Sequence, residues 1–533
     1  MTKVSIAALR SGGASLALIA SVGASFAAGD LIIAMPANNE PASLDGHIDP
    51  YQSTWLINSL ITDPLVILSP DGTYIPGLAT EWSVSEDGTT WSFTLREGLT
   101  FQDGEPFNAE AVRVNLERVL APETASAQLA SDIGPIASIE TDGETGLTII
   151  YDTPWVTLLD ALRRAPLWSP AALASAEPGD MAATLIGTGP FRFVDWAQND
   201  NITMERWDDY AGVTAISDAP GPVGLDSVTI RFIGESAVMG QVLATGEVNM
   251  VYTLPPLFSD QYVDNPDYTM LSRGQAGTGL QMVMNTRNAP LNDIRVRQAL
   301  LLAKDSAAAN DILYDGLYQA SDGPLNNIHP CYWDGATDMY PFDQERAAAL
   351  LDDAGWIMGD GGMRVAQGVE GVADGTPLVI RYSTLHHQEI GEVFQAQMRP
   401  VGIDLQIEVV PGPVQLDMVQ RRDFELMYER QRSPSPLILD QVWNSAYDEP
   451  GGWAWTGYAD AELDGILAQL RAVFDDGERC DLARDAQQII MENALMLPTL
   501  SQPIIVGLDA SVQGFQMGAE GNWFFLQNTS IEE

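Results

Sequence analysis

Lysine is nearly absent from this chain of 533 residues, because Lys3 and Lys304 are the only two. Lysine and arginine together number 26 against 73 acids, which gives a net charge of −47. Such a charge repels the phosphates of nucleic acids and anionic lipids, so the composition argues against both as partners. An acid-rich surface with little lysine also suits a protein bathed in external salt, a hypothesis about solubility and not about fold.

Residues and motifs typical of catalysis are scarce as well. The chain has four histidines, and it lacks the G-x-S-x-G, H-E-x-x-H, P-loop and C-x-x-C patterns. His386 and His387 in "LHHQE" are a conceivable metal pair, but adjacent side chains point apart on most backbones, which favours ordinary loop histidines. We therefore expect no catalytic residue, no cofactor and no bound metal, and a secreted hydrolase is the more remote alternative.

Cysteine is limited to Cys331 and Cys480. Two cysteines are compatible with an oxidising compartment, and the sequence leaves open whether they pair or remain free thiols.

Long apolar runs are missing after the first residues. Lys3 and Arg10 precede the short apolar run "ASLALIASVGA" (14–24), and Ser25 and Ala27 fit a cleavage site before Ala28. This pattern predicts a cleaved signal peptide over 1–27; an uncleaved anchor is the alternative, but the run is short for a membrane span. No cysteine follows the run, which excludes a lipid anchor there. We expect a soluble periplasmic protein with a net charge of −49 once Lys3 and Arg10 are removed with the leader.

The chain has enough hydrophobic residues to form large cores. Hydrophobic residues make up 46% of it, with 13 tryptophans, and the length allows three or four domain-sized units. The sequence shows strand patterns at 30–36, around Trp91–Leu95, and at 377–384, 403–410 and 424–428. Helical patterns lie between or before these strands, at 291–313, 342–356 and 389–402. Asn108 is placed to cap a further helix. This order predicts an α/β fold, clearest in the second half.

Six segments, in order, resemble the extracytoplasmic solute-binding proteins of family 5, the peptide/nickel/opine class that serves ABC importers. They are "GLATEWSVSEDGTTWSFTLREGLTFQDGEPFNAEAV" (77–112), "IGTGPFRFVDWAQNDNITMERWDDY" (186–210), "VLATGEVNMVY" (242–252), "VMNTRNAPLNDIRVRQALLLAKD" (283–305), "FDQERAAALLDDAGW" (342–356) and "MRPVGIDLQIEVV" (398–410). The resemblance implies the two-lobed periplasmic-binding-protein fold (type II), α/β in class, with an extra subdomain inserted in the first lobe.

The resemblance also implies a domain plan and a function. We expect lobe I over 28–276 with the inserted subdomain at about 68–195, lobe II over 277–507, and a C-terminal return to lobe I over 508–533. Hinges are expected near Gly277–Asn285 and Gln502–Leu508. The expected function is the capture of a small peptide or peptide-like solute by a monomer that delivers it to a membrane permease. A sugar, an opine or a metal chelate is the alternative ligand.

The stretch "RRDFELMYERQRSPSP" (421–436) concentrates arginines in this acidic chain. In peptide-binding members of the family, an aspartate four residues before the proline of an Asp-Tyr-x-x-Pro pattern holds the α-ammonium group of the peptide. Counting back four from Pro436 gives Arg432, whose planar guanidinium suits a carboxylate or phosphate instead. Arg430 shares its face in an extended segment. The alternatives are pairing with Glu429 or another local acid, or simple solvation, as we expect for Arg421 and Arg422.

Further candidates for ligand binding follow from the family's cleft. The loop after the first strand offers Asn38, Asn39 and Glu40, and the crossing segment offers Gln281. Four aromatic residues lie close together in the chain after the arginines: Trp443, Trp453, Trp455 and Tyr458. The three tryptophans are candidates for stacking on a ligand, although we expect at least two of the four aromatic residues to belong to the core.

Overall fold

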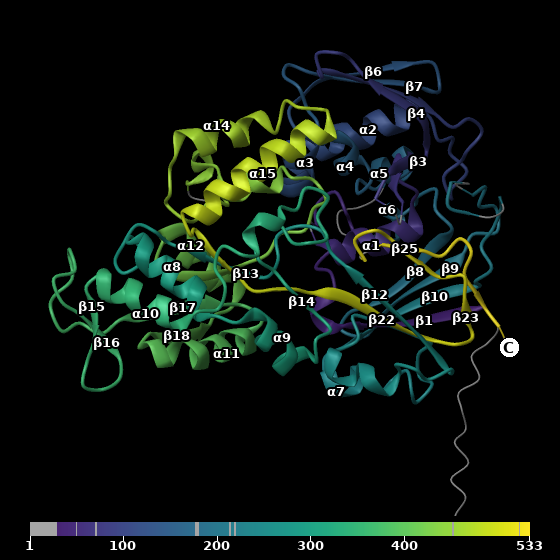
Figure 1. The fold of residues 1–533 in the computed structure, drawn as a ribbon. Helices are drawn as coiled ribbons and strands as arrows, with labels where there is room; N and C mark the ends of the chain where they lie inside the picture. Colours follow the sequence, from purple (N-terminus) through teal and green to yellow (C-terminus); the bar gives the residue numbers. More distant parts are fainter. Residues whose placement is uncertain are drawn as a thin grey trace, which may run out of the picture.

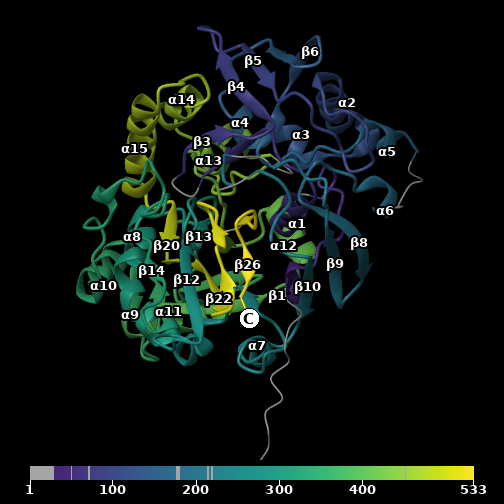
Figure 2. The same cartoon turned by 90° about the vertical axis from the view of Figure 1, so that its right-hand side faces the viewer.

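The computed structural model describes residues 29–49, 51–69, 72–175, 181–212, 215–217, 220–449, 452–521 and 523–532. The predicted signal peptide, residues 1–27, lies outside the described residues. Within these ranges no helix is both long and apolar enough to cross a membrane. Strands and helices form two lobes and an inserted subdomain, which lies at the top of both Figure 1 and Figure 2.

The first lobe is built on a mixed sheet, called here the first sheet. Among the described residues its seven strands lie in the order β12-β22-β11-β1-β10-β9-β8. β1 runs parallel to β10 and to β11, so the carboxyl ends of these strands lie at one edge. The strands are β1 (Asp30–Pro36), β8 (Phe191–Ala197), β9 (Asn201–Arg206), β10 (Ser227–Ile233), β11 (Met250–Tyr252), β12 (Tyr268–Gly274) and β22 (Pro503–Asp509).

The other elements of the first lobe surround this sheet. The short helix η1 follows β1 directly, and α1 precedes the inserted subdomain. The C-terminal segment returns to the first sheet through β22 and then forms short strand pairs. These elements are η1 (Ala37–Asn39), α1 (Gln52–Ile61), α7 (Ser236–Met239), η3 (Pro256–Gln261), β23 (Val512–Gln513), β24 (Gln516–Met517), β25 (Phe524–Phe525) and β26 (Ser530–Ile531).

The inserted subdomain has an antiparallel sheet of its own, in the order β4-β5-β7-β6. Asn108 caps α2 as predicted, because its side chain accepts a hydrogen bond from the backbone N–H of Ala111 at 2.9 Å. The elements are β2 (Val66–Leu68), β3 (Tyr74–Pro76), β4 (Ala79–Val84), β5 (Thr90–Leu95), α2 (Ala109–Leu120), η2 (Pro122–Thr124), α3 (Ala127–Ile133), β6 (Ile136–Asp142), β7 (Gly146–Tyr151), α4 (Leu158–Leu162), α5 (Pro170–Ser175) and α6 (Met181–Thr184).

The second lobe is built on a sheet with the order β18-β17-β19-β13-β20, called here the second sheet. β17 runs parallel to β18 and β19, so their carboxyl ends also share an edge. Its strands are β13 (Gln281–Met284), β17 (Val379–Thr384), β18 (Asp404–Val409), β19 (Leu426–Glu429) and β20 (Met496–Pro498).

Helices cover the second sheet, and those nearest the inserted subdomain are α14 and α15 (Figures 1 and 2). The remaining elements of this lobe are α8 (Ile294–Ala303), α9 (Ser306–Tyr314), β14 (Gln319–Ala320), η4 (Asp334–Ala336), α10 (Gln344–Asp353), β15 (Trp356–Met358), β16 (Arg364–Ala366), α11 (Gln388–Met398), η5 (Arg399–Val401), α12 (Gly412–Arg421), α13 (Ile438–Trp443), η6 (Ser445–Tyr447), α14 (Ala461–Gln469), α15 (Asp476–Glu492) and β21 (Leu500–Ser501).

One predicted helix differs from the structure. The segment 291–313 forms α8 and α9, separated by an extended residue, Lys304, and by Asp305, whose side chain caps α9. Lys304 is buried and its Nζ donates to Ser306 Oγ at 2.7 Å. Burial lowers the pKa of Lys304 to about 8, partly offset by Asp322 and Asp305.

The chain passes between the lobes after β12 and again before β22. The first crossing packs tightly: a Cβ on Gly277, which has φ of 146°, would lie 2.2 Å from the Gln431 carbonyl oxygen. Gly277 also forms an isolated β-bridge with Arg432. Only glycine fits a crossing segment this close to another backbone.

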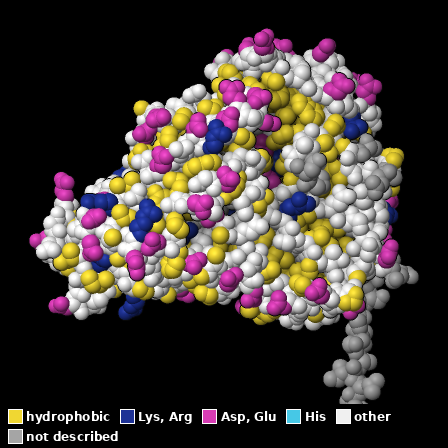
Figure 3. Space-filling view, viewed as in Figure 1, with side chains coloured by type: hydrophobic (Ala, Val, Ile, Leu, Met, Phe, Trp, Pro, Cys, Tyr) yellow, Lys and Arg dark blue, Asp and Glu magenta, His cyan; other side chains and the backbone are white. Residues whose placement is uncertain are grey.

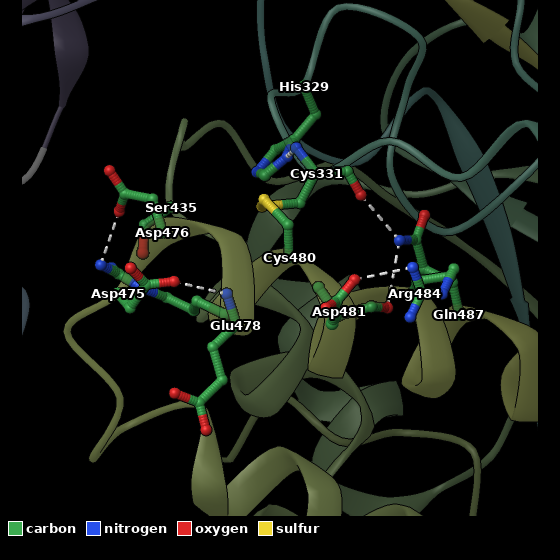
Figure 4. The surroundings of a disulfide bond; sticks show 12 residues. His329, Cys331, Ser435, Asp475, Asp476, Glu478, Cys480, Asp481, Arg484 and Gln487 are labelled. Carbon is green, nitrogen blue, oxygen red and sulfur yellow. Dashed lines mark hydrogen bonds and ion pairs between the residues drawn. A yellow bond between two sulfur atoms is a disulfide. The ribbon is translucent and has the colours of Figure 1, made fainter.

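The two cysteines, whose pairing the sequence left open, form a disulfide between Cys331 and Cys480 (Figure 4). The bond ties the loop between β14 and η4 to the first turns of α15. Beside it, Gln487 Nε2 donates to the Cys331 carbonyl at 2.9 Å, and the Cys331 N–H donates to His329 Nδ1 at 3.0 Å. Burial lowers the pKa of His329 to about 4, so this ring is neutral.

Phe474, in the loop between α14 and α15, reaches from the second lobe to the inserted subdomain. Its ring centroid lies 6.1 Å from that of Trp91, and it packs against that subdomain's core. A Cβ on Gly88 would come within 2.3 Å of the Phe474 ring, so glycine leaves the space that the phenyl group occupies. The two parts are therefore in direct apolar contact on the side of α15.

Acidic side chains are scattered over the face shown in Figure 3, where lysine and arginine gather at only a few places. The distribution agrees with the composition of the whole chain, with 73 acids and 26 bases.

Candidate ligand-binding site

The carboxyl edges of the two sheets meet at Arg432. β1 and β11 end at Pro36 and Tyr252 in the first sheet, and β19 ends at Glu429, three residues before Arg432, in the second. Arg432 Nη1 donates to Gln52 Oε1 at 3.1 Å, a contact between the lobes that joins residues 380 positions apart. Ligands of open α/β sheets bind outside the carboxyl ends of the strands, so this region is the candidate site.

Arg432 has no acidic partner among the described residues. Its side chain is exposed, and no carboxylate there lies within ion-pair distance of it, whereas Arg421 pairs with Asp417 and Arg422 pairs with Asp448 at 2.9 Å. For Arg421 and Arg422 simple solvation was expected; Arg421 is largely exposed (64%) but also pairs with an acid, and Arg422 is paired and mostly buried (14% exposed). The guanidinium of Arg432 is left facing a neutral amide.

Arg430 is partly buried and lies between the two crossing segments. Its Nη1 donates to Gln502 Oε1 at 2.5 Å, and its Nη2 donates to Gln275 Oε1 at 2.6 Å. Burial, with the charge of Arg432, lowers the pKa of Arg430 to about 9. Arg430 thus holds the crossings together and adds positive charge behind Arg432.

Aromatic rings line the second-lobe side of the site. The Tyr428 ring lies 6.3 Å from that of His386 and 6.0 Å from that of His387, centroid to centroid. Burial lowers the pKa of His386, and the charges of His387 and Arg432 lower it further. Tyr252 faces Arg432 and Arg430 from the first lobe; burial raises its pKa and the two arginines oppose that rise.

Glu389, an acid on this side of the site, is already occupied. It accepts from Tyr314 Oη at 2.6 Å and lies 3.2 Å from His387 Nδ1. Burial acts to raise its pKa, but the hydrogen bonds from His387 and Tyr314 outweigh it and bring the pKa to about 2. Glu389 therefore remains charged without neutralising the arginines.

The three predicted polar residues of the loop after β1 differ in exposure and in hydrogen bonding. Asn38 is exposed and Asn39 half-buried, both in η1 at the edge where β1 and β11 end. Glu40 accepts from Trp196 Nε1 at 2.9 Å and from the Asn199 N–H at 2.8 Å. Its carboxylate is thus used within the first lobe.

Gln281 is buried inside the second sheet. Its Nε2 donates to Glu429 Oε2, and its own Oε1 has no hydrogen-bond partner among the described residues. Burial raises the pKa of Glu429 to about 7, and the hydrogen bonds from Gln281 and Thr278 only partly offset this rise. Gln281 therefore lies behind Arg430 in the lobe interior.

The predicted tryptophans lie apart from Arg432. Trp443 and Trp455 are buried in the core of the second lobe, and Trp453, 46% exposed, stacks on Trp455 with centroids 5.4 Å apart. Arg287 Nη1 donates to the Trp455 carbonyl. Two residues earlier, the Asn285 N–H donates to the carbonyl of Glu425, the residue just before β19. The stacked pair therefore sits at the opposite end of β19 from Arg432.

Sequence reasoning missed several residues that the structure adds. Gln52 and Tyr252 approach from the first lobe, and Gln275 and Gln502 approach Arg430 from the crossings. His386, just past the end of β17, was considered from the sequence only as a conceivable metal ligand and not as a neighbour of Arg432. In the described part of the chain, no group of three or more His, Cys, Asp or Glu side chains is placed to hold a metal ion.

Comparisons with known proteins agree on the class. The family model described as "Bacterial extracellular solute-binding proteins, family 5 Middle" matches residues 73–451. The nickel-binding periplasmic protein of Escherichia coli K12 is 28% identical over 469 residues, covering 83% of each chain. The glutathione-binding protein GsiB of Pectobacterium atrosepticum is 25% identical over 531 residues, covering 94% of each.

Solved structures share the fold. NikA from Brucella suis in complex with Fe(III)-EDTA superimposes with a TM-score of 0.82 at 23% identity, covering 94% of this chain and 100% of that one. DppA from Helicobacter pylori in complex with the peptide STSA gives a TM-score of 0.77 at 22% identity, with coverages of 95% and 98%. These likenesses confirm the predicted two-lobed fold class.

Proposed function

This chain belongs to the bacterial extracellular solute-binding proteins of family 5, and on that premise we propose that it captures an anionic, peptide-like solute between its lobes. The captured solute is delivered to the membrane permease of an ABC importer. The protein acts as a monomeric carrier rather than an enzyme, and its acidity argues against nucleic acid as a partner.

The observation that carries the anionic ligand is Arg432. Its guanidinium lies where the lobes meet, without an acidic partner among the described residues, and Arg430 adds a second positive charge behind it. A bidentate, charge-assisted contact with a carboxylate is the interaction that this group makes best. The long-range repulsion from the acidic surface is screened over about 8–10 Å at physiological salt, so the contact can outweigh it.

A metal chelate is the second candidate ligand, because the carboxylates of a chelator suit the same arginine. The relatives' names include nickel binding and glutathione binding, and NikA was solved with Fe(III)-EDTA. Peptide and chelate ligands share free carboxylates, so Arg432 would hold either. Asn38 and Asn39 are the first-lobe candidates for further hydrogen bonds, whereas Trp453 lies at the far end of β19 and is no longer a candidate.

We place the lobe boundaries where the sheets change. Pro503 begins β22, which pairs with β11 and β12, so the proposed return to lobe I starts at 503 and not at 508. The inserted subdomain is proposed for about 65–190, because its core begins at Leu65 and β8 belongs to the first sheet. Residues 1–27 are proposed as a cleaved signal peptide without a lipid anchor, which directs the protein to the periplasm.

The test is a ligand panel followed by calorimetry. A thermal-shift screen with reduced glutathione, the peptide STSA, Fe(III)-EDTA, agropinic acid and gluconate identifies the tightest binder by its stabilisation of the folded state. Arg432→Gln should then weaken the affinity for that compound by about 10- to 100-fold, the effect of losing a charge-assisted hydrogen bond.

Arg421→Gln is the matched control, because it removes an exposed arginine of the same lobe that already pairs with Asp417. Its affinity should stay within about twofold of wild type. Equal affinities for Arg432→Gln and wild type would contradict the proposal, since Arg432 would then be a solvated surface residue.

A further inference from the structure

Gln52 is the first-lobe residue that faces Arg432. It is half-buried at the first position of α1, beside Tyr51, which is 62% exposed and makes no side-chain cap for this helix. The Gln52 amide oxygen accepts the hydrogen bond from Arg432 Nη1, and no hydrogen bond from Gln52 Nε2 to another described residue is present. The amide therefore offers one acceptor to the arginine and keeps an NH₂ group for another acceptor.

We propose that Gln52 is a specificity-determining residue for the ligand. Without ligand, its amide oxygen occupies the position on the Arg432 guanidinium that a carboxylate oxygen of the ligand takes when it binds. This inference rests on the proposed function of Arg432. An amide oxygen and a carboxylate oxygen are both planar acceptors, but the charged one makes the stronger bond to a guanidinium. An arriving carboxylate therefore displaces the Gln52 oxygen.

The displaced amide then serves the ligand. Rotation of the Gln52 side chain brings its Nε2–H to the carboxylate, so one carboxylate oxygen accepts from Arg432 and the other from Gln52. A contact that joined the lobes directly becomes a contact through the ligand. The exchange explains how anion recognition in the second lobe is coupled to the first lobe.

The chemistry of this position favours a neutral residue. Two acids discussed above already have partners: Glu40 accepts from Trp196 and Asn199, and Glu389 is bonded to Tyr314 and His387. An acid at position 52 would pair with Arg432 and compete with every anionic ligand. A glutamine holds the arginine in place and yields to a charged oxygen.

The test uses calorimetric titration with whichever compound of the stated panel binds the wild type most tightly. Gln52→Glu should weaken its affinity by at least 10-fold, because an internal ion pair occupies Arg432. Gln52→Leu, which removes both the competing oxygen and the donating NH₂, should weaken it by about 3- to 10-fold, because removing the competing oxygen partly offsets the loss of one hydrogen bond to a charged group.

Gln128→Glu is the matched control, since it adds the same charge to an exposed glutamine of the inserted subdomain. It should leave the affinity within twofold of wild type. The double variant Gln52→Leu/Arg432→Gln should lose less affinity than the product of the single losses, because both residues act on one carboxylate.

The outcomes separate the two proposals. If Arg432→Gln loses affinity but Gln52→Glu binds like wild type, the role of Gln52 is wrong and the anion site stands. If Arg432→Gln binds like wild type, or if no panel compound binds, both proposals fall. Multiplicative losses in the double variant would also overturn the role of Gln52, because independent residues do not share one group.

Discussion

Arg430 and Arg432 carry the same guanidinium at alternate positions of one strand end, yet their surroundings assign them different tasks. Arg430 is hydrogen-bonded to Gln275 and Gln502, so it is committed to the crossing segments. Arg432 has a neutral, displaceable acceptor in Gln52. We expect Arg432 to contact the ligand, and Arg430 to position the crossings and add charge.

The count from Pro436 singled out Arg432 because the resemblance to peptide-binding members of the family supplied the spacing of four residues; its contact with a ligand stays a prediction. Gln52 and Tyr252 were not predictable, because they reach the arginine only after more than 150 residues of chain have folded back. Trp443 and Trp455 were predicted as possible ligand contacts but are buried in the core. A cluster of aromatic residues has the same sequence pattern whether it lines a cleft or fills a core, so only the folded structure distinguishes the two. A sequence motif can therefore identify a candidate residue, but the residues that contact it from distant parts of the chain are known only from the tertiary structure.

Glu429 makes stability depend on pH. Burial raises its folded pKa to about 7 from an ordinary value of 4.5, so the folded protein binds more protons than the unfolded chain between these values. The free energy of unfolding therefore falls as pH rises from about 4.5 to about 7. Glu429→Gln should remove this fall and make the variant more stable than wild type by up to about 3 kcal/mol above pH 7.

Urea unfolding at pH 4, 5, 6, 7 and 8 measures the effect. Below pH 4.5 the difference between wild type and variant should be smallest, since the wild-type carboxyl is then protonated in both states. Glu408→Gln, at an exposed position on β18, is the control and should show no such trend. A difference that is constant across the pH series would contradict the buried, neutral Glu429.

At the scale of elements, strands were predicted better than helix ends. β1 matches the predicted 30–36, and β17, β18 and β19 lie within two residues of the predicted ranges, because apolar strands bounded by loops have sharp limits. The segment 291–313 was predicted as one helix because its apolar period continues across Lys304. Asp305 and Ser306 are themselves a capping signal, which the continuous period obscured.

The contact of Phe474 with the inserted subdomain is a second tie between the lobes. Phe474→Ala should lower the free energy of unfolding by about 1–2 kcal/mol, as expected for a half-buried phenyl group. If this contact belongs to the ligand-bound arrangement of the lobes, its loss should also weaken affinity for the panel ligand severalfold. Thermal unfolding and calorimetric titration measure the two effects.

Phe342→Ala is the control for this substitution. Phe342 is 48% exposed, precedes α10 and lies in the same lobe, so its truncation should change stability little and affinity not at all. If Phe474→Ala and Phe342→Ala bind the ligand equally well, the loop between α14 and α15 has no part in closure.

For the whole molecule, the expected motion is a rigid-body rotation of the lobes about the crossing segments. The residues between β12 and β13, and Gln502 between β21 and β22, are the proposed pivots, since the flanking strands are paired with other strands of their own lobes. The predicted second hinge extended to Leu508, and most of it is β22. Pairing on both sides of that strand restrains it.

Small-angle X-ray scattering with and without the panel ligand should report this rotation. Saturating ligand should reduce the radius of gyration of wild type, because bridging by the ligand favours the closed arrangement. Arg432→Gln at the same ligand concentration should give a smaller reduction. A radius of gyration that is identical with and without bound ligand would exclude closure as the response to binding.

The burial of Lys304 has a practical consequence. If the first 27 residues are removed, Lys304 is the last lysine in the chain, and its ammonium group is enclosed and bonded to Ser306. Amine-reactive dyes would then meet a single accessible primary amine, the new N-terminus, just ahead of β1. The folded protein would accept one fluorophore or one surface attachment at a defined point, without engineering, and so lends itself to use as a reporter of its own ligand.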